Sequence, residues 1–376
     1  MANRFAAFIL VSASALLTSA TSTPAMGRDL IYGSWVSPKH GIMAHALPPL
    51  FEQVQKETSG AVTWKLVAGG ALVSGRSTLA GIRDGVIDAG FVIPSYTSTE
   101  LPGNNLVMGV QVFGEDTVAT SAAAAETVML ECPECLEDFR KQNAVFLAGH
   151  AASPFYLMCK PAVTKLAELT GKKIRSSGSG IRLVSMLGGI PTPMSPAEGL
   201  TAMERGAIDC VLGAIAWLQS YSYQDSVTHV IDYPLGIVGA LGTMTTNRKT
   251  WDRFTPEQKK AHITHMPPMS ARAIIKGYVE EDLRIADQAK AKGIKFVKVD
   301  NKEFDAVVER FSATEEQNLV ETAKRFGMKN PEKVLAAYRR NLKKWHALSP
   351  EIGLDVDKYA AAIKREIYDK LDPNKM

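Results

Sequence analysis

The sequence contains one short pattern twice, and this repetition constrains the fold more than any other feature. Gly85-Val-Ile-Asp88 leads into the apolar run 87–93, and Gly206-Ala-Ile-Asp209 leads into the apolar run 208–213. Each copy follows segments whose spacing predicts a strand and then a helix, an order that is typical of a parallel sheet with helices on its faces. Two such units predict an α/β protein with two lobes and a binding site in the cleft between them.

The second unit places Arg175 where a strand ends. The strand 172–174 precedes it, and a Ser/Gly turn and a helix from about Gly180 follow it. At such a corner, side chains and the N–H groups of the helix N-terminus converge on a ligand. A guanidinium can bind a carboxylate there through two parallel hydrogen bonds. We therefore expect Arg175 to bind an organic anion.

The first residues predict a secretory signal peptide. Arg4 gives a positive start, residues 5–17 are apolar, and Thr23-Pro24-Ala25 offers a cleavage site of small residues. The apolar run is too short to cross a bilayer, which argues against a membrane anchor. We expect residues 1–25 to be removed and the mature protein to be exported in soluble form.

Composition and motifs argue against several classes of function. The formal net charge of +4 over 376 residues is too small and too dispersed for nucleic-acid binding. The sequence has no GxGxxG or GxxxxGK[ST] pattern for phosphates and no GxSxG elbow. His262 and His265 are spaced H-x-x-H, which is insufficient for zinc. We expect neither an enzyme nor a bound cofactor or metal.

The four cysteines are of two kinds. Cys132 and Cys135 form a C-P-E-C pair, for which an oxidising compartment favours a small structural disulfide. A redox-active pair would need a strand directly before it, and zinc would need two more ligands. Cys159 and Cys210 lie in apolar, strand-like runs, where we expect buried free thiols.

Five stretches, in this order and spacing, carry a resemblance that covers nearly the whole mature chain. They are LIYGSWVSPKHG, SGAVTWKLVAGGALVSGRSTLAGIRDGVIDAGFV, LTGKKIRSSGS, PTPMSPAEGLTAMERGAIDC and TTNRKTWDRFTPEQKKA. The chain resembles the DctP-like substrate-binding proteins of the tripartite ATP-independent periplasmic (TRAP) transporters. The resemblance implies a monomeric periplasmic protein that encloses its ligand between two lobes and delivers it to a membrane permease.

The resemblance also implies how the chain is divided. Lobe I would contain residues 26–150 and 241–270, and lobe II residues 151–240, with crossing strands joining the two. A long helix at 269–292 would span both lobes, and a C-terminal strand and helices, 293–376, would pack on them. We expect Pro267-Pro268 to separate the long helix from the segment before it.

For the binding site, the resemblance places Arg175 on the arginine that binds the ligand carboxylate. Positions that usually line the family's cleft correspond to Trp35, Ser95, Tyr96, Tyr156 and Gly213. To these we add Ser177 as a hydrogen-bond partner for a buried carboxylate, and Phe155 and Trp217 as aromatic surface. Trp217 could instead be core packing. We expect Arg182 to be a solvated charge, and His40 and His150 to be structural or solvated.

Two departures from the family bear on the ligand. Tyr156 stands where the family often has a second arginine or another polar group, and Gly213 stands where it often has an asparagine. One strong anion anchor in a more aromatic cleft predicts a monocarboxylate of apolar or aromatic character. The same fold would serve a ligand-sensing protein that docks onto a receptor, and a periplasmic enzyme is the less favoured alternative.

Overall fold

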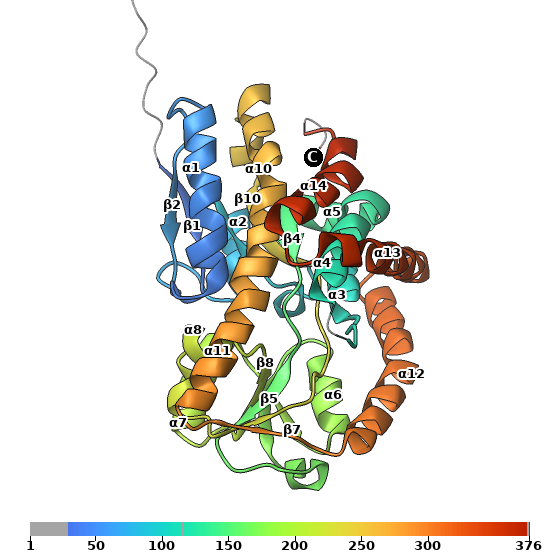
Figure 1. Ribbon diagram of the computed structural model, residues 1–376. Helices are drawn as coiled ribbons and strands as arrows, with labels where there is room; N and C mark the ends of the chain where they lie inside the picture. The colour runs from blue at the N-terminus through green and yellow to red at the C-terminus, as the bar shows by residue number, and fades with distance from the viewer. Residues whose placement is uncertain (1–28, 115, 374–375) are drawn as a thin grey trace, which may run out of the picture.

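The computed structural model describes residues 29–114, 116–373 and 376, and within them the chain forms two mixed sheets. Helices surround each sheet, and the two sheets occupy the upper and lower parts of the molecule in Figure 1. The predicted two-lobed α/β fold is therefore confirmed. The predicted signal peptide, residues 1–25, lies outside the described residues.

Lobe I is built on a five-stranded sheet in the order β2-β1-β3-β10-β4. Its strands are β1 (Leu30–Gly33), β2 (Trp64–Val67), β3 (Ala89–Val92), β4 (Ala144–His150) and β10 (Leu241–Asn247). β1 pairs in parallel with β2 and β3, whereas β10 is antiparallel to β3 and β4. The predicted return of the chain to lobe I at Leu241 is thus confirmed.

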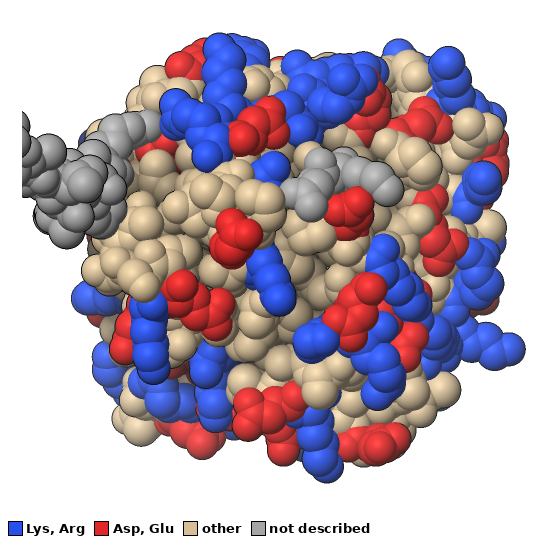
Figure 2. Space-filling model, turned by 90° about the horizontal axis from the view of Figure 1, so that it is seen from above, with Lys and Arg blue, Asp and Glu red and all other residues tan. Residues whose placement is uncertain are grey.

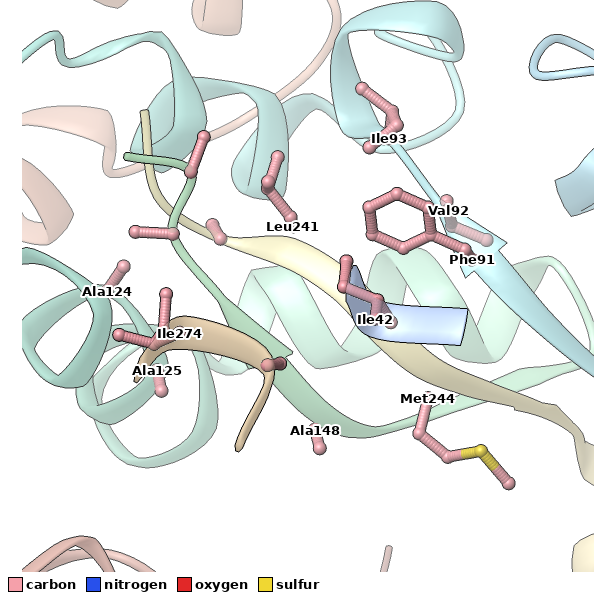
Figure 3. Close-up of a cluster of buried hydrophobic side chains, with 14 of the residues drawn as sticks. Ile42, Phe91, Val92, Ile93, Ala124, Ala125, Ala148, Leu241, Met244 and Ile274 are labelled. Carbon is pink, nitrogen blue, oxygen red and sulfur yellow. The ribbon is translucent and has the colours of Figure 1, made fainter. Parts of the chain in front are cut away.

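The helices of lobe I connect these strands and cover the sheet. They are η1 (Ile42–Ala46), α1 (Leu47–Glu57), α2 (Thr78–Arg83), η2 (Pro94–Tyr96), α3 (Pro102–Gly109), α4 (Thr117–Glu126), η3 (Thr127–Glu131), α5 (Pro133–Lys141) and α9 (Arg248–Asp252). Between the sheet and these helices, the apolar side chains of β3, β4 and β10 meet those of η1, α4 and α10 (Pro256–Ile274). Figure 3 shows Ile42, Phe91, Met244 and Ile274 among them.

Lobe II is built on a six-stranded sheet in the order β11-β9-β5-β8-β6-β7. Its strands are β5 (Tyr156–Cys159), β6 (Lys173–Ser176), β7 (Ile190–Pro193), β8 (Cys210–Gly213), β9 (His229–Ile231) and β11 (Lys295–Val297). Its helices are η4 (Leu166–Leu169), α6 (Gly180–Met186), α7 (Pro196–Glu204), α8 (Trp217–Ser220) and η5 (Tyr223–Asp225). A second apolar core lies between this sheet, α6 and α12 (Asn301–Arg325).

The repeated G-x-I-D pattern performs the same structural task in both lobes. The Asp88 carboxylate accepts a hydrogen bond from the backbone N–H of Ile31 (2.9 Å), and the Asp88 N–H donates to the Ile31 carbonyl (2.9 Å). In lobe II, Asp209 makes the same two bonds with Lys173, at 2.8 and 2.7 Å. Each aspartate therefore fixes the register of its strand beside the neighbouring parallel strand, which is β1 for Asp88 and β6 for Asp209. The bonds of Asp209 position β6, the strand that contains Arg175.

Two crossing segments and a helical rod join the lobes. The N–H of Ala152 donates to the Val238 carbonyl and that of Phe155 to the Gly236 carbonyl, both at 2.9 Å, so the segments 151–155 and 234–240 run side by side. The rod consists of α10 (Pro256–Ile274), η6 (Ile275–Val279) and α11 (Glu280–Ala291), and Figure 1 shows it passing from one lobe to the other.

The rod corrects the predicted helix 269–292, because it begins at Pro256. Pro267 and Pro268 lie inside α10 and do not interrupt it. Each removes one N–H donor from the helix. Packing of α10 against α1, α14 and β4 compensates for these losses. The helix begins with a capping box between Thr255 and Gln258, as α7 does between Ser195 and Glu198.

The C-terminal helices pack on both lobes. They are α12 (Asn301–Arg325), α13 (Pro331–Ile352), α14 (Val356–Glu366) and η7 (Tyr368–Lys370). Phe304 and Phe311 of α12 enter the core of lobe II, whereas α13 packs against α4 of lobe I. Arg182, which we expect to be a solvated charge, has a side chain that is 39 % exposed, and its guanidinium also forms an ion pair with the buried Glu315 of α12.

Both cysteine pairs form disulfides. The bond between Cys132 and Cys135 confirms the prediction for the C-P-E-C pair, which lies where η3 ends and α5 begins. The expectation of free thiols at Cys159 and Cys210 is wrong, because these residues are also disulfide-bonded. The antiparallel register of β5 and β8 places them directly opposite each other. Residues 51 positions apart in the chain are brought together by this pairing.

Within the described part of the chain, the helices are all too short or too polar to cross a membrane. The face of the molecule seen in Figure 2 carries Lys/Arg and Asp/Glu side chains intermixed. That face therefore presents no extended field of one sign.

Candidate functional site

Arg175 lies near the carboxyl end of β6, and only 1 % of it is exposed. Its Nε donates a hydrogen bond to the carbonyl of Met194 (2.8 Å), and Nη1 donates to that of Leu212 (3.3 Å). Its Nη2 donates to the hydroxyls of Tyr96 (3.2 Å) and Ser177 (3.4 Å). Two carbonyls and one hydroxyl of lobe II thus bind the guanidinium, and the hydroxyl of Tyr96 binds it from lobe I.

All four of these acceptors are neutral, and no ion pair found within the described residues includes Arg175. Arg175 contributes to lowering the pKa of Glu198, but the hydrogen bond from Ser195 is the main cause and occupies that carboxylate at the start of α7. The Trp217 ring lies 5.3 Å from the guanidinium carbon and adds a cation–π attraction. A buried cation without a counter-ion is costly, and an anion beside Arg175 would offset that cost.

A cavity of about 50 Å³ lies between the lobes beside Arg175. Six other predicted site residues line it: Trp35, Ser95, Tyr96, Phe155, Ser177 and Trp217. A cavity of about 150 Å³, roughly three times this volume, is of a size that binds benzene. An aromatic ligand therefore requires the lobes to separate further or the lining side chains to move.

Lobe I supplies the aromatic wall of the cavity. Trp35 follows β1 and stacks on Phe91 of β3 with ring centroids 6.0 Å apart, and its Nε1 donates to the Phe91 carbonyl (3.2 Å). Tyr96 packs edge-on against Trp35 at 5.8 Å. Ile93 and Leu241 also line the cavity, and Figure 3 shows them close to Phe91. Burial raises the pKa of Tyr96 and Arg175 partly lowers it, so its hydroxyl stays protonated at neutral pH.

Tyr156 and Gly213 are not among the residues that line this cavity. They pair with each other at the ends of β5 and β8. A Cβ atom on Gly213 would come within 2.0 Å of the Trp217 ring. Gly213 therefore acts by lacking a side chain, because this allows Trp217 to lie over the end of β8 and reach Arg175.

Three polar aromatic side chains in the cavity were not predicted as ligand-binding: His40, Tyr221 and Tyr278. His40 is 2 % exposed, and burial lowers its pKa to about 4, so the imidazole is neutral at pH 7. The spacing of Tyr221, four residues after Trp217 and so on the same side of a helical turn, could have indicated it. His150 does not line the cavity, and its Nδ1 shares a hydrogen bond with Thr243 Oγ1.

Two lining groups are buried with no hydrogen-bond partner in the described part of the chain. They are Ser95 Oγ and Trp217 Nε1. Buried polar atoms normally have partners, and exceptions call for a physical explanation. Their place beside Arg175 makes them further hydrogen-bond donors for a ligand in the cavity.

Asp282 of α11 connects the rod to two neighbouring elements. Its carboxylate accepts hydrogen bonds from Ser153 Oγ in a crossing segment (2.5 Å) and from the N–H of Ala216 just before α8 (2.6 Å). Burial raises its pKa to about 7, although these two hydrogen bonds oppose the shift. The rod, a crossing segment and the helix of Trp217 therefore meet at one carboxyl group.

Comparison with known proteins gives a consistent picture. An uncharacterized protein of Haemophilus influenzae is 26% identical over 208 residues, which are 54% of this chain and 60% of that protein, so the match spans less than two thirds of the curated relative.

Three solved TRAP solute-binding proteins share the fold over nearly their whole length. One from Bordetella bronchiseptica, with bound (R)- and (S)-mandelate, is 23% identical with a TM-score of 0.71 over 85% of this chain and 99% of its own. One from Rhodoferax ferrireducens, with copurified benzoate, is 18% identical with a TM-score of 0.75 over 86% and 99%. A marine metagenome protein specific for aromatic acids, with metahydroxyphenylacetate, is 19% identical with a TM-score of 0.71 over 84% and 98%.

The family model for DctP, described as bacterial extracellular solute-binding protein family 7, matches residues 33–352. This range includes both sheets apart from the first three residues of β1, and it includes the residues that line the cavity. The resemblance drawn from the sequence is thereby confirmed: the chain belongs to family 7 of the bacterial extracellular solute-binding proteins, the DctP family.

Proposed function

We propose that this protein is the periplasmic solute-binding component of a TRAP transporter, which binds a small organic acid between its lobes and delivers it to a membrane permease. The observation that carries the proposal is the environment of Arg175, a buried guanidinium whose hydrogen-bond partners in the described chain are all neutral. A carboxylate would supply the missing charge and could accept two parallel hydrogen bonds. Membership of the DctP family supports the transport role.

The lining of the cavity favours a monocarboxylate with an aromatic or apolar body. Arg175 is the sole Lys or Arg among the lining residues, which include no Asp or Glu. A second carboxylate would have no cation there, and aromatic rings from both lobes face the remaining space. Relatives in this fold bind mandelate or benzoate, but others bind galacturonate or glucuronate, so the fold alone does not select the ligand.

Ligand capture would proceed by closure at the hinge. Tyr96 belongs to lobe I and Arg175 to lobe II, so a carboxylate that contacts both links the two lobes. The crossing segments and the rod are the connections about which the lobes would turn. A ligand that contacts both lobes stabilises the closed state by its differential affinity for the two states.

The proposal is tested by calorimetry after a thermal-shift screen of mono- and dicarboxylates, aromatic acids and sulfonates. A bound ligand raises the melting temperature, because it stabilises the folded state alone. We expect an aromatic monocarboxylate among the hits, and Arg175→Ala to weaken its binding by about 2–5 kcal/mol. Arg205→Ala, on the exposed end of α7, serves as a matched control. A loss at Arg175 of less than about 0.5 kcal/mol would show that this residue is not the anchor, because a buried pair is worth more.

A further inference from the structure

One part of the cavity is formed by an imidazole and two phenols, His40, Tyr221 and Tyr278, which we call the imidazole–phenol cluster. His40 lies in the loop between β1 and η1, Tyr221 follows α8, and Tyr278 lies in η6 of the rod. The His40 ring centroid is 5.3 Å from that of Tyr278 and 6.1 Å from that of Tyr221. The cluster thus joins lobe I, lobe II and the rod at one place.

Two glycines bring the cluster together. A Cβ atom on Gly41 would lie 2.4 Å from the backbone of Gly277, and one on Gly277 would lie 3.1 Å from that of Gly41. The start of η1 and the middle of η6 therefore touch backbone to backbone. His40, which precedes Gly41, and Tyr278, which follows Gly277, become neighbours because of this contact. Any larger residue at Gly41 would separate them.

The cluster has hydrogen-bonding groups to spare. His40 Nδ1 accepts from the Ile42 N–H (3.3 Å), which assigns the proton of the neutral ring to Nε2. Within the described chain, His40 Nε2 and the Tyr221 hydroxyl form no hydrogen bond. Trp217 Nε1 lies close enough to the Tyr278 hydroxyl to lower its pKa, but the pair falls outside hydrogen-bond geometry. A ligand group that pairs with them therefore replaces unmet hydrogen bonds, which an apolar group would leave unmet.

The chemistry of the cluster favours a neutral ligand group that can both accept and donate a hydrogen bond. The cluster is uncharged, so it cannot compensate a second carboxylate, and the lining includes no acid that would pair with an ammonium group. The nearby Asp282 already accepts from Ser153 and Ala216. A hydroxyl fits, because it can accept from His40 Nε2–H and donate to a phenol oxygen.

We propose that the imidazole–phenol cluster binds a hydroxyl group on an aromatic carboxylic acid whose carboxylate lies on Arg175. This inference rests on the proposed function and narrows its ligand class from aromatic acids to hydroxylated aromatic acids. Tyr278, Tyr221 and His40 are then specificity-determining residues.

The test compares matched acids by isothermal titration calorimetry. The probes are benzoate with its 3- and 4-hydroxy derivatives, and phenylacetate with its 3- and 4-hydroxy derivatives. For the full chain, we expect at least one hydroxylated acid to bind about tenfold or more tightly than its parent, the range of a well-formed hydrogen bond. In Tyr278→Phe, Tyr221→Phe and the double variant, this affinity ratio should fall toward one. Tyr359→Phe removes a buried phenol of α14 outside the cavity and should retain the ratio.

Each outcome decides the matter. A ratio near one for every pair, with the parent acids bound, would overturn the hydroxyl site and leave the proposed function standing. A large ratio that persists in the double variant would place the hydroxyl elsewhere and also overturn it. Failure of all six acids to bind the wild-type chain would overturn the aromatic-acid proposal and this inference together. Melting curves of the ligand-free variants establish that each is folded.

Discussion

The two lobes share one scaffold but contribute different chemistry to the cavity between them. In each lobe, an aspartate of the G-x-I-D pattern accepts a hydrogen bond from the backbone of the neighbouring parallel strand, at Ile31 in lobe I and at Lys173 in lobe II. In lobe I the strand continues toward aromatic and hydroxyl side chains, whereas lobe II presents a buried cation. The same strand pairing therefore sets up both walls, and the residues just beyond the strands determine what each wall binds.

The lobes also differ in how disulfides constrain them. Cys132–Cys135 closes a loop of three positions beside α5 of lobe I, whereas Cys159–Cys210 closes one of 51 positions within the sheet of lobe II. A longer closed loop restricts the unfolded chain more. The lobe that carries Arg175 therefore depends more strongly on an oxidising compartment.

The largest predicted effect separates these two bonds. We expect Cys159→Ala with Cys210→Ala to lower the free energy of unfolding by about 4 kcal/mol, and Cys132→Ala with Cys135→Ala by about 1.5 kcal/mol, from the chain entropy of the two loops. Urea denaturation of both double variants and the wild type measures the difference. Equal losses would mean that loop length does not control these contributions.

A smaller effect concerns Asp282, which joins the rod to a crossing segment and to lobe II. Its folded-state pKa of about 7 lies above the ordinary value of 3.8, so the folded chain binds this proton more tightly than the unfolded chain. The contribution to stability is full below about pH 4 and is lost as the pH rises through about 7, by about 3 kcal/mol between pH 4 and pH 7. Asp282→Asn, which keeps one acceptor oxygen, should remove this loss.

The measurement is the difference between the wild-type and Asp282→Asn unfolding free energies at several pH values. A difference is needed because burial lowers the pKa of His40, His150 and His262, so these residues destabilise the folded chain as the pH falls. Asp138 of lobe I, whose pKa burial raises only to about 6, gives a comparison, because Asp138→Asn should remove a smaller loss. A difference that does not vary with pH would place the Asp282 pKa near its ordinary value.

The sequence was most informative where function follows from position along one segment. Arg175 could be found because it ends a strand before a turn and a helix, and Trp217 because it follows the same unit. The residues that were missed depend on contacts between distant segments. Tyr278 enters the cavity because Gly277 touches Gly41, and no local pattern near Tyr278 records that contact.

Two other errors have the same origin. The bond between Cys159 and Cys210 requires the antiparallel register of β5 and β8, which apolar periodicity alone does not specify. Pro267 and Pro268 are poor helix residues by local rules, but tertiary packing of α10 overrides that preference. Local chemistry was therefore predicted better than pairing between distant elements.

The smallest predicted effect tests the contribution of lobe I to the anion site. Tyr96→Phe keeps the ring that packs on Trp35 and removes the hydroxyl that Arg175 contacts. We expect ligand affinity to fall about fivefold, or roughly 1 kcal/mol, as for one ordinary hydrogen bond. This is well below the effect of Arg175→Ala, because lobe II supplies the charge. Calorimetry with the acid identified in the screen measures the affinity of both variants. The control is Tyr233→Phe, because the Tyr233 hydroxyl donates a hydrogen bond to Asp305 on the surface, away from the cavity. If Tyr96→Phe weakened binding as much as Arg175→Ala, the phenol would be an equal anchor, and the assignment of charge recognition to lobe II alone would be wrong.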